Sequence, residues 1–291
     1  MSRALVVGVG IGMMYADVLK DVVDDVVIID TLQNKHLEIS DNAKFDIAII
    51  STPNFLHEHY ASVVADRGLS NLIVVDKPGF KNAASWSNFI QKYPDIRLQM
   101  VKNNLFRDSI RNWRDIFESD PDNVLDVRWH NNDRVPKPGS WFTTQEMSFG
   151  GVEVDLLPHL INILYAVRGD LPHVSRVKFE QNWKLEDLKR SDYGEVKTDG
   201  VYDVSDFTEV VFADGSIISA DWRTLNLHDD IAIRIYDASG ALILHEELGL
   251  CPCYAYGKMF KFMIDMNEEQ HIALSKLDLQ VHHIIHDHKN A

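Results

Sequence analysis

The first 105 residues alternate short apolar runs with helical patterns, and this alternation constrains the fold more than any other feature. The apolar runs predict strands over residues 4–9, 26–30, 45–51, 71–76 and 96–101. Helical patterns lie between them over residues 15–20, 55–66 and 83–92. Strands buried on both faces are continuously apolar, and strands that alternate with helices form a parallel sheet with right-handed crossovers. The sequence therefore predicts an α/β fold that begins with a doubly wound Rossmann domain.

The pattern changes after a helix expected over residues 105–118. A strand over 123–133 and a loop rich in proline and glycine over 134–142 come next. Residues 174–247 are rich in strand patterns, with hairpin turns at Ala213–Gly215 and Asp237–Gly240, and helices return from about Tyr254. We therefore expect two domains. Residues 1–118 form the Rossmann domain, and residues 119–291 form an α+β domain on a mostly antiparallel sheet.

Charge and composition exclude several classes of partner. The chain of 291 residues has a formal net charge of -15, which opposes binding to nucleic acid phosphates and to anionic membranes. The first apolar run is short and interrupted by glycine, so we expect no secretory signal, and no apolar run reaches the roughly 18 residues that a membrane span needs. Cys251 and Cys253 are expected to be free thiols. We therefore expect a cytoplasmic protein with neither nucleic acid nor membrane as a partner.

A glycine-rich turn lies between the first strand and the first helix. In the dinucleotide fingerprint G-x-G-x-x-G, the first two glycines allow a tight turn and the approach of backbone amides to a pyrophosphate. Gly8 and Gly10 fit these two places, while Met13 stands at the third. Ile11 and Gly12 complete the turn. The strand-turn-helix context predicts a nucleotide-binding site.

Asp30 ends the second predicted strand, 20 residues after Gly10. An acid at this spacing accepts hydrogen bonds from the ribose hydroxyls of the adenosine and repels a 2'-phosphate. NAD is therefore the expected cofactor. NADP is the less favoured alternative, which Thr31 and Lys35 could accommodate.

Two further segments follow the third and fourth strands, at the edge where open α/β sheets bind ligands. The residues after strand three that we assign to the cofactor site are Ser51, Thr52, Pro53, Asn54 and His57. After strand four, the residues are Asp76 and Lys77. Lys77 is expected near the reactive end of the cofactor.

The stretch "GGVEVDLLPHLINIL", residues 150–164, predicts an apolar helix with a polar stripe. Asp155, His159 and Asn162 fall in one sector roughly 60 degrees wide. The stripe faces either solvent, as on an ordinary surface helix, or a functional site. Pro158 is expected to kink the helix beside His159.

These motifs together resemble the glucose-fructose oxidoreductase and inositol dehydrogenase family. The resemblance covers the fingerprint, Thr52-Pro53-Asn54 with His57, Asp76-Lys77-Pro78, and Gly150-Gly151 with Asp155 and His159. It implies a Rossmann domain followed by a substrate-binding and oligomerisation domain with an open antiparallel sheet. It also implies that Lys77 and His159 line a substrate cleft, with Asp155 in support. The chain departs from the family pattern at Met13 and at Asp76, where glutamate is usual.

The resemblance and the residues together suggest an NAD-dependent dehydrogenase acting on a secondary alcohol of a sugar, sugar derivative or cyclitol, and hence a role in carbohydrate metabolism. His159 would be the general base, because histidine titrates near neutrality, and Lys77 would stabilise alkoxide charge. A reductase of an imine or conjugated double bond is the second interpretation. A dinucleotide-binding regulator without activity is the third.

Two further expectations concern assembly and metals. Strands such as "FTEVVFA" and "IAIRIY" contain apolar residues that could cover the open face of the second sheet, which predicts a homodimer or homotetramer. His282 and His286 stand four residues apart on a predicted helix, but no partner completes a zinc spacing. We expect no metal site there and a solvated helix face instead.

Overall fold

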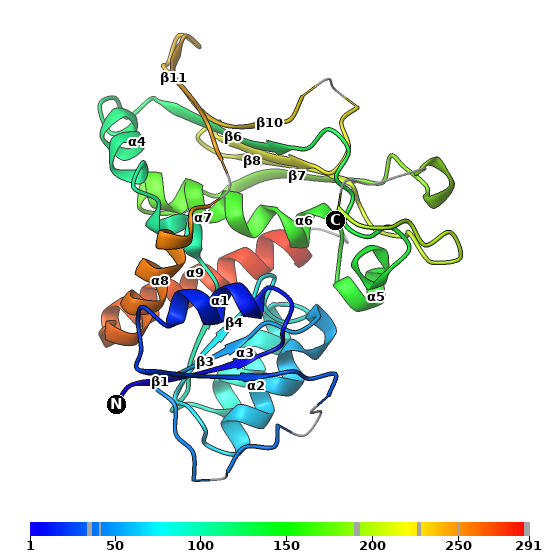
Figure 1. The fold of residues 1–291 in the computed structure, drawn as a ribbon. Coiled ribbons are helices and arrows are strands. Elements are labelled where there is room, and N and C mark those ends of the chain that lie inside the picture. Colours follow the sequence, from blue (N-terminus) through cyan, green and yellow to red (C-terminus); the bar gives the residue numbers. More distant parts are fainter. Residues whose placement is uncertain (34–36, 41, 189–192, 226–227, 250, 288–291) are drawn as a thin grey trace. The chain divides into compact units, whose positions relative to one another are not determined.

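A computed structural model describes the chain except for residues 34–36, 41, 189–192, 226–227, 250 and 288–291. The chain forms two compact units, and each contains one sheet (Figure 1). The first unit consists of Met1–Asn103 and Pro252–His286, and the second contains Asn104–Cys251. This division differs from the expected boundary after residue 118 in two respects: residues 104–118 belong to the second unit, and the last helices pack with the first.

The first unit is built on a parallel sheet of five strands in the order β2-β1-β3-β4-β5. Its strands are β1 (Arg3–Val7), β2 (Asp25–Ile29), β3 (Ile47–Ile50), β4 (Leu72–Val75) and β5 (Arg97–Met100). The connecting helices are α1 (Gly12–Leu19), α2 (His57–Asp66) and α3 (Ala83–Lys92), and a short turn η1 (Asn54–Leu56) precedes α2. Every residue of β3 and β4 is buried. The doubly wound sheet predicted from the continuous apolar runs is confirmed, and its order reverses beside β1, where such sheets bind ligands.

Two C-terminal helices complete the first unit. Helix α8 (Cys253–Asp265) packs against α1, while α9 (Glu268–His286) packs against α3 and β5. The side chains of α8 that are buried are Ala255, Met259, Phe260 and Met263. Within the described ranges, no helix is both long and apolar enough to cross a membrane.

The second unit is built on six strands in the order β11-β10-β6-β9-β8-β7. They are β6 (Val124–His130), β7 (Val174–Glu180), β8 (Phe207–Phe212), β9 (Ile217–Asp221), β10 (Asp230–Tyr236) and β11 (Leu242–Glu247). Only β6 and β9 pair in parallel. The predicted mostly antiparallel sheet is therefore confirmed. The turns expected at Ala213–Gly215 and Asp237–Gly240 join β8 to β9 and β10 to β11.

Helices cover one face of this second sheet. Helix α7 (Leu157–Arg168) packs on β6 and β9, and α4 (Ile110–Phe117) packs on α7. The remaining short helical segments of the unit are η2 (Asn103–Phe106), η3 (Trp141–Thr143), α5 (Gln145–Ser148), α6 (Val152–Asp155) and η4 (Leu185–Asp187).

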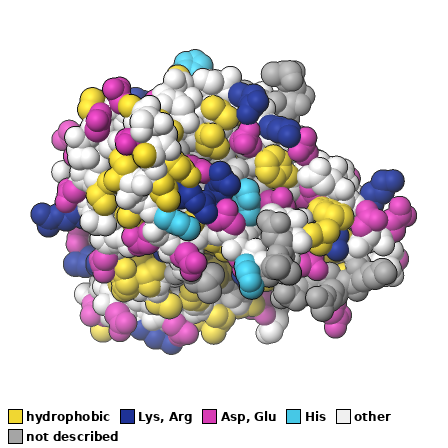
Figure 2. Space-filling model, turned by 90° about the horizontal axis from the view of Figure 1, so that it is seen from above, with side chains coloured by type: hydrophobic (Ala, Val, Ile, Leu, Met, Phe, Trp, Pro, Cys, Tyr) yellow, Lys and Arg dark blue, Asp and Glu magenta, His cyan; other side chains and the backbone are white. Residues whose placement is uncertain are grey.

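The other face of the sheet is open and carries charged side chains. Arg128 forms ion pairs with Asp126 and Asp230, and Arg234 also pairs with Asp230. Figure 2 looks onto this face and shows basic and acidic side chains side by side among apolar ones. The most buried residues of β8, which are Thr208, Val210 and Phe212, alternate with half-buried ones and lie on the covered face. Phe207 and Val211 of β8 lie on the open face and are half-buried.

Candidate active site

The glycine-rich turn packs directly on the end of β3. A Cβ atom on Gly8 would lie 2.6 Å from the carbonyl oxygen of Ser51, and Gly8 has a φ of +109°, so both space and backbone conformation require glycine. The Ser51 hydroxyl donates a hydrogen bond of 3.1 Å to the carbonyl of Val7. A Cβ atom on Gly10, by contrast, would meet no atom within 4 Å. Gly10 is exposed, which leaves room for a phosphate against the backbone.

Gly12 allows the close packing of helix against sheet that the third glycine of the fingerprint usually allows. A Cβ atom on Gly12 would lie 2.4 Å from the Ser51 hydroxyl oxygen and 3.1 Å from Val6. Helix α1 begins at this residue, so its first turn lies tightly against the sheet. Met13 is 46% exposed and takes no part in this contact. The departure at position 13 therefore does not disturb the close approach of helix and sheet.

Asp30 directly follows β2 and is half-buried. Its Oδ1 accepts a hydrogen bond of 2.9 Å from the backbone amide of Leu32. The amide of Gly8 donates to the carbonyl of Ile29 at 2.9 Å, which holds the glycine turn beside the end of β2. The acid and the glycine turn thus occupy neighbouring strand ends, as an adenosine ribose and pyrophosphate would require. Thr31 is buried, and Lys35 lies outside the described residues.

The segment Asp76–Phe80, here called the lysine segment, follows β4 and carries the half-buried Lys77. Oδ1 of Asp76 accepts a hydrogen bond of 2.8 Å from the Tyr15 hydroxyl and one of 2.9 Å from the amide of Lys77. Burial, with the charge of Asp76 beside it, raises the pKa of Tyr15 well above its usual value, so the phenol keeps its proton and donates. Helix α1 and the lysine segment are therefore joined through Asp76.

His57 joins the lysine segment to the residues after β3. Its imidazole is fully buried, with Nδ1 2.8 Å from the carbonyl oxygen of Gly79 and Nε2 2.8 Å from that of Thr52. Burial lowers the pKa of His57, and the charge of Asp76 opposes this shift. Pro53 and Asn54 lie between the two anchored ends, and Asn54 opens η1. The buried histidine thus lies between the segments that follow β3 and β4 and can donate one hydrogen bond to either carbonyl.

The second set of predicted site residues belongs to the second unit and begins with a glycine pair. A Cβ atom on Gly151 would lie 1.8 Å from the carbonyl oxygen of Ser205. The next amide, that of Val152, donates to this oxygen at 3.0 Å, and the Ser205 hydroxyl donates to Glu153. Gly151 is therefore required because the backbone before β8 passes directly against it.

The helix expected over residues 150–164 is interrupted rather than kinked. Helix α6 ends at Asp155 and α7 begins at Leu157, with Leu156 between them at φ -111° and ψ -34°. Pro158 lies in the first turn of α7, where a missing amide proton costs no helical hydrogen bond. In one continuous helix its ring would clash with the carbonyl four residues earlier. The proline therefore starts a new helix.

Asp155 and His159 are half-buried in a stretch whose neighbours are buried. Oδ2 of Asp155 accepts a hydrogen bond of 3.0 Å from the indole nitrogen of Trp222, and the ring of His159 lies 6.0 Å from that of Trp129 between centroids. Asn162 is only 2% exposed, so its predicted place in the same accessible stripe is wrong. The helix break after Asp155 changes the rotation of Asp155 relative to His159 and Asn162, which both lie on α7.

The sequence reasoning missed Trp129 and Trp222. Trp222 directly follows β9 and continues the alternation of the buried residues Ile218 and Ala220, which face α7. This alternation of apolar residues was the sequence signal that could have identified Trp222. Trp129 precedes the last residue of β6, the strand that also packs against α7.

The expectation for the C-terminal histidines is wrong in one respect. His282 is fully buried instead of lying on a solvated face, and its Nε2 accepts a hydrogen bond of 3.3 Å from the amide of Phe80. In the part of the chain that the structure describes, no three His, Cys, Asp or Glu side chains gather as a metal site would require.

No protein-family model matches the chain, and no curated protein sequence matches it. Solved structures share its fold. GenD2 from gentamicin A biosynthesis, in complex with NAD, is 15% identical, with 100% of this chain and 95% of that chain covered and a TM-score of 0.67. Levoglucosan dehydrogenase in complex with NADH and levoglucosan is 13% identical, with 98% and 95% covered and a TM-score of 0.68. A putative myo-inositol dehydrogenase from Sinorhizobium meliloti is 15% identical, with 98% and 95% covered and a TM-score of 0.66. The fold that the family resemblance implied is therefore confirmed along the whole chain.

Proposed function

We propose that this chain is an NAD-dependent oxidoreductase that transfers a hydride between the nicotinamide and a secondary alcohol or ketone of a sugar, sugar derivative or cyclitol. The proposal rests chiefly on one observation. The Rossmann turn and the lysine segment lie at one edge of the parallel sheet, and the same chain carries an aspartate at the end of α6 and a histidine in the first turn of α7. The structures that share the fold include dehydrogenases with NAD or NADH bound.

The residues fit a dinucleotide without a 2'-phosphate. Gly10 leaves space for the pyrophosphate beside the start of α1, whose amides carry partial positive charge. Asp30 stands where the adenosine ribose would lie and disfavours a phosphate there. When bound, NAD supplies the acceptor for a hydride. NADP is the less favoured cofactor.

Side chains of the protein would accept the proton that leaves the substrate hydroxyl. His159 is proposed as the general base, because an imidazole titrates near neutral pH without special surroundings. Lys77 would donate a hydrogen bond to the reacting oxygen and stabilise its developing negative charge. The carboxylate of Asp155, oriented by Trp222, would favour the protonated form of the group that it contacts.

Two other functions use the same fold. A reductase of imines or conjugated double bonds would need the same hydride donor and a proton donor in place of the base. A dinucleotide-binding regulator would need the cofactor site alone. The half-buried Lys77 and the Trp222-oriented Asp155 favour an enzyme over a regulator, because a regulator would not need either arrangement.

The test is a turnover screen with a binding measurement beside it. Purified protein is titrated with NADH by fluorescence and then assayed with NAD against sugars, amino sugars, anhydrosugars and cyclitols. The reverse reaction is assayed with ketones and imines. We expect NADH binding together with oxidation of at least one polyol. Tight NADH binding with no turnover on any of these compounds would favour the regulator.

We also propose a homodimer or homotetramer that forms through the open face of the second sheet. Its ion pairs make the face polar, so association would rely on matched charges around half-buried residues such as Phe207 and Val211. Light scattering at micromolar concentration tests this. A monomer at both low and high salt would contradict it.

A further inference from the structure

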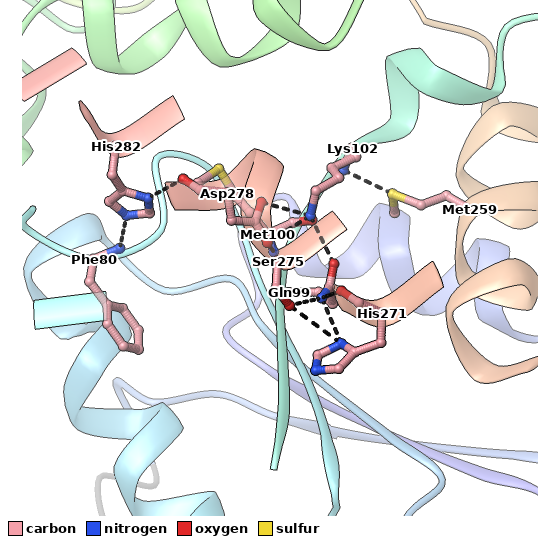
Figure 3. A network of polar contacts seen from close by, with 9 residues as sticks. All are labelled: Phe80, Gln99, Met100, Lys102, Met259, His271, Ser275, Asp278 and His282. Atoms are coloured by element: carbon pink, nitrogen blue, oxygen red, sulfur yellow. Dashed lines mark hydrogen bonds and ion pairs between the residues drawn. The ribbon is translucent and has the colours of Figure 1, made fainter. Parts of the chain in front are cut away.

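Helix α9 carries a row of polar side chains among its buried apolar ones, and this row contacts the residues of β5 and the segment after β4. His271, Ser275, Asp278 and His282 follow one another at spacings of four, three and four residues, which places them on one side of the helix (Figure 3). Ser275 and His271 both contact the side-chain nitrogen of Gln99, at 2.8 and 2.9 Å. This polar row ends at His282, beside the lysine segment.

The middle of the row is a buried ion pair. Nζ of Lys102 lies 2.7 Å from Asp278, and both side chains are 1% exposed. Asp278 also accepts a hydrogen bond of 3.0 Å from the amide of Met100. Burial lowers the pKa of Lys102 and raises that of Asp278 to about 6, while each charge opposes the shift of the other. The pair fixes α9 to the end of β5, because separating it would leave a buried charge without compensation.

One helical turn later, the contacts of His282 define its tautomer. Nδ1 lies 2.8 Å from the backbone carbonyl of Asp278, which can only accept, so Nδ1 carries the proton. Nε2 then has a lone pair, and the amide of Phe80 donates to it at 3.3 Å. Figure 3 shows the imidazole between these two partners. Both hydrogen bonds are satisfied by one neutral form of the ring.

The lysine segment is shaped to receive this ring. A Cβ atom on Gly79 would lie 2.8 Å from Cε1 of His282, and Gly79 has a φ of +81°. The ring of Trp86 lies 4.8 Å from that of His282 between centroids, and Phe80 and Trp86 are both fully buried. A backbone amide at Phe80 without a hydrogen-bond acceptor would destabilise the folded protein, because water does not reach this buried place.

We propose that His282 is a positioning residue for Lys77, through the backbone of the lysine segment. His57 holds the carbonyl of Gly79 from the side of β3, and His282 holds the next amide from the side of α9. With Asp76 fixed by Tyr15, the backbone is held on both sides of Lys77, so the reach and direction of its side chain are restricted. The C-terminal helix thereby becomes part of the catalytic apparatus. This inference rests on the proposed role of Lys77 in hydride transfer.

Two substitutions at His282 test the contribution of each ring nitrogen separately. An asparagine amide can replace Nδ1–H toward the Asp278 carbonyl but does not reach Phe80, whereas a glutamine carbonyl oxygen can replace Nε2 as the acceptor. We therefore compare His282→Asn with His282→Gln in the full chain. The matched control is His283→Asn, because His283 is the exposed neighbour on the same helix.

Two measurements do not depend on a known substrate. One is the rate at which Lys77 is acylated by succinimidyl acetate, followed by peptide mass spectrometry. The other is hydrogen exchange of the peptide that contains Phe80. For His282→Asn we expect at least a threefold change in the Lys77 labelling rate and at least tenfold faster exchange. His282→Gln should stay within twofold of wild type in both, as should His283→Asn.

Once a substrate is known, His282→Asn should lower kcat by about 10- to 100-fold, because a shift on the order of 1 Å at a reacting group has such effects. The KM for NAD should change less than threefold, since Gly10 and Asp30 are untouched. The proposal would be overturned if His282→Asn and His282→Gln showed the same Lys77 labelling rate and the same hydrogen-exchange rate at Phe80. A chain that turns over no substrate while the labelling difference persists would instead contradict the proposed function and leave the positioning contact supported.

Discussion

The two sheets of this protein bury their residues in different ways, and the difference explains how each contributes to the site. In the parallel sheet, β3 and β4 are buried along their whole length, so their side chains serve only packing. The site residues of the first unit therefore come from the segments that follow the strands. In the second sheet, β8 alternates buried and half-buried residues. There the covered face itself contributes Trp129 and Trp222 beside His159 and Asp155.

The comparison indicates that the site is held mainly by backbone contacts in the first unit and by side-chain contacts in the second. At the end of the parallel sheet, the glycine turn and the lysine segment are held mainly by contacts to backbone atoms, such as those of His57. In the second unit, side chains meet across elements, as the indole of Trp222 meets the carboxylate of Asp155. We expect substitutions at the glycine turn and Asp30 to affect cofactor binding, those at His159 and Asp155 to affect the chemistry, and those at Lys77 to affect both.

The strongest test of this division removes the proposed base. His159→Ala should lower turnover by roughly 100-fold to 10,000-fold, the usual range for losing a positioned acid or base, and leave NADH affinity nearly unchanged. Lys77→Ala should be as damaging to turnover and also weaken NADH binding, because it belongs to the cofactor unit. Steady-state kinetics and NADH titration give both quantities. Wild-type turnover in His159→Ala would assign the base to another residue, with Lys77 as the first candidate.

Two glycines give a second test, one from each unit. Gly151→Ala should lower the unfolding free energy by about 3 kcal/mol, because its Cβ would overlap the Ser205 carbonyl. Gly10→Ala should leave stability almost unchanged, because no atom lies within 4 Å. It should nevertheless weaken NADH binding by about tenfold or more, since the new methyl occupies the place of the pyrophosphate. Thermal melting and NADH titration separate the two effects. Equal melting temperatures for both variants would contradict this assignment.

Cofactor preference tests the first unit alone. NADH should bind more tightly than NADPH by about tenfold, because the carboxylate of Asp30 and a 2'-phosphate are like charges in contact. In Asp30→Ser the preference should shrink or reverse, while turnover with NAD at saturation stays close to that of wild type. Parallel fluorescence titrations measure the ratio. Equal affinities of wild type for both cofactors would show that Asp30 does not face the ribose.

The smallest expected effect concerns the second sheet. Burial raises the pKa of Asp221 to about 6, above its value in the unfolded chain, so the folded state holds this proton more tightly. The contribution of this carboxyl to the unfolding free energy should therefore be lost as pH rises from about 4 to about 6. Asp221→Asn should remove this loss. Relative to wild type, the unfolding free energy of the variant should be higher by about 1 kcal/mol above pH 6, after a discount for solvent screening, and equal below pH 4. Urea unfolding at pH 4 and pH 7.5 measures it. An equal effect of the substitution at both pH values would exclude Asp221 as the titrating group.

Local sequence patterns predicted much of the architecture. The continuous apolar runs predicted β1 to β5, and turn residues predicted the hairpins of the second sheet, because strand period and turn chemistry depend on neighbours in the chain. Contacts between distant segments were beyond such reasoning. The assignment of α8 and α9 to the first unit depends on residues as far apart as Gln99 and Ser275.

For the site, the order of residues along the chain was enough to predict which of them follow which strand. Gly8, Asp30 and Lys77 could be placed at the same edge, because parallel strands end together. Tertiary structure alone decided what surrounds them. It placed Ser51 against Gly12, interrupted the helix before Pro158, directed Trp222 at Asp155 and buried His282 against the lysine segment. The physical reason is that hydrogen bonds and close packing between distant segments depend on distances of a few ångströms, which no spacing along the chain specifies.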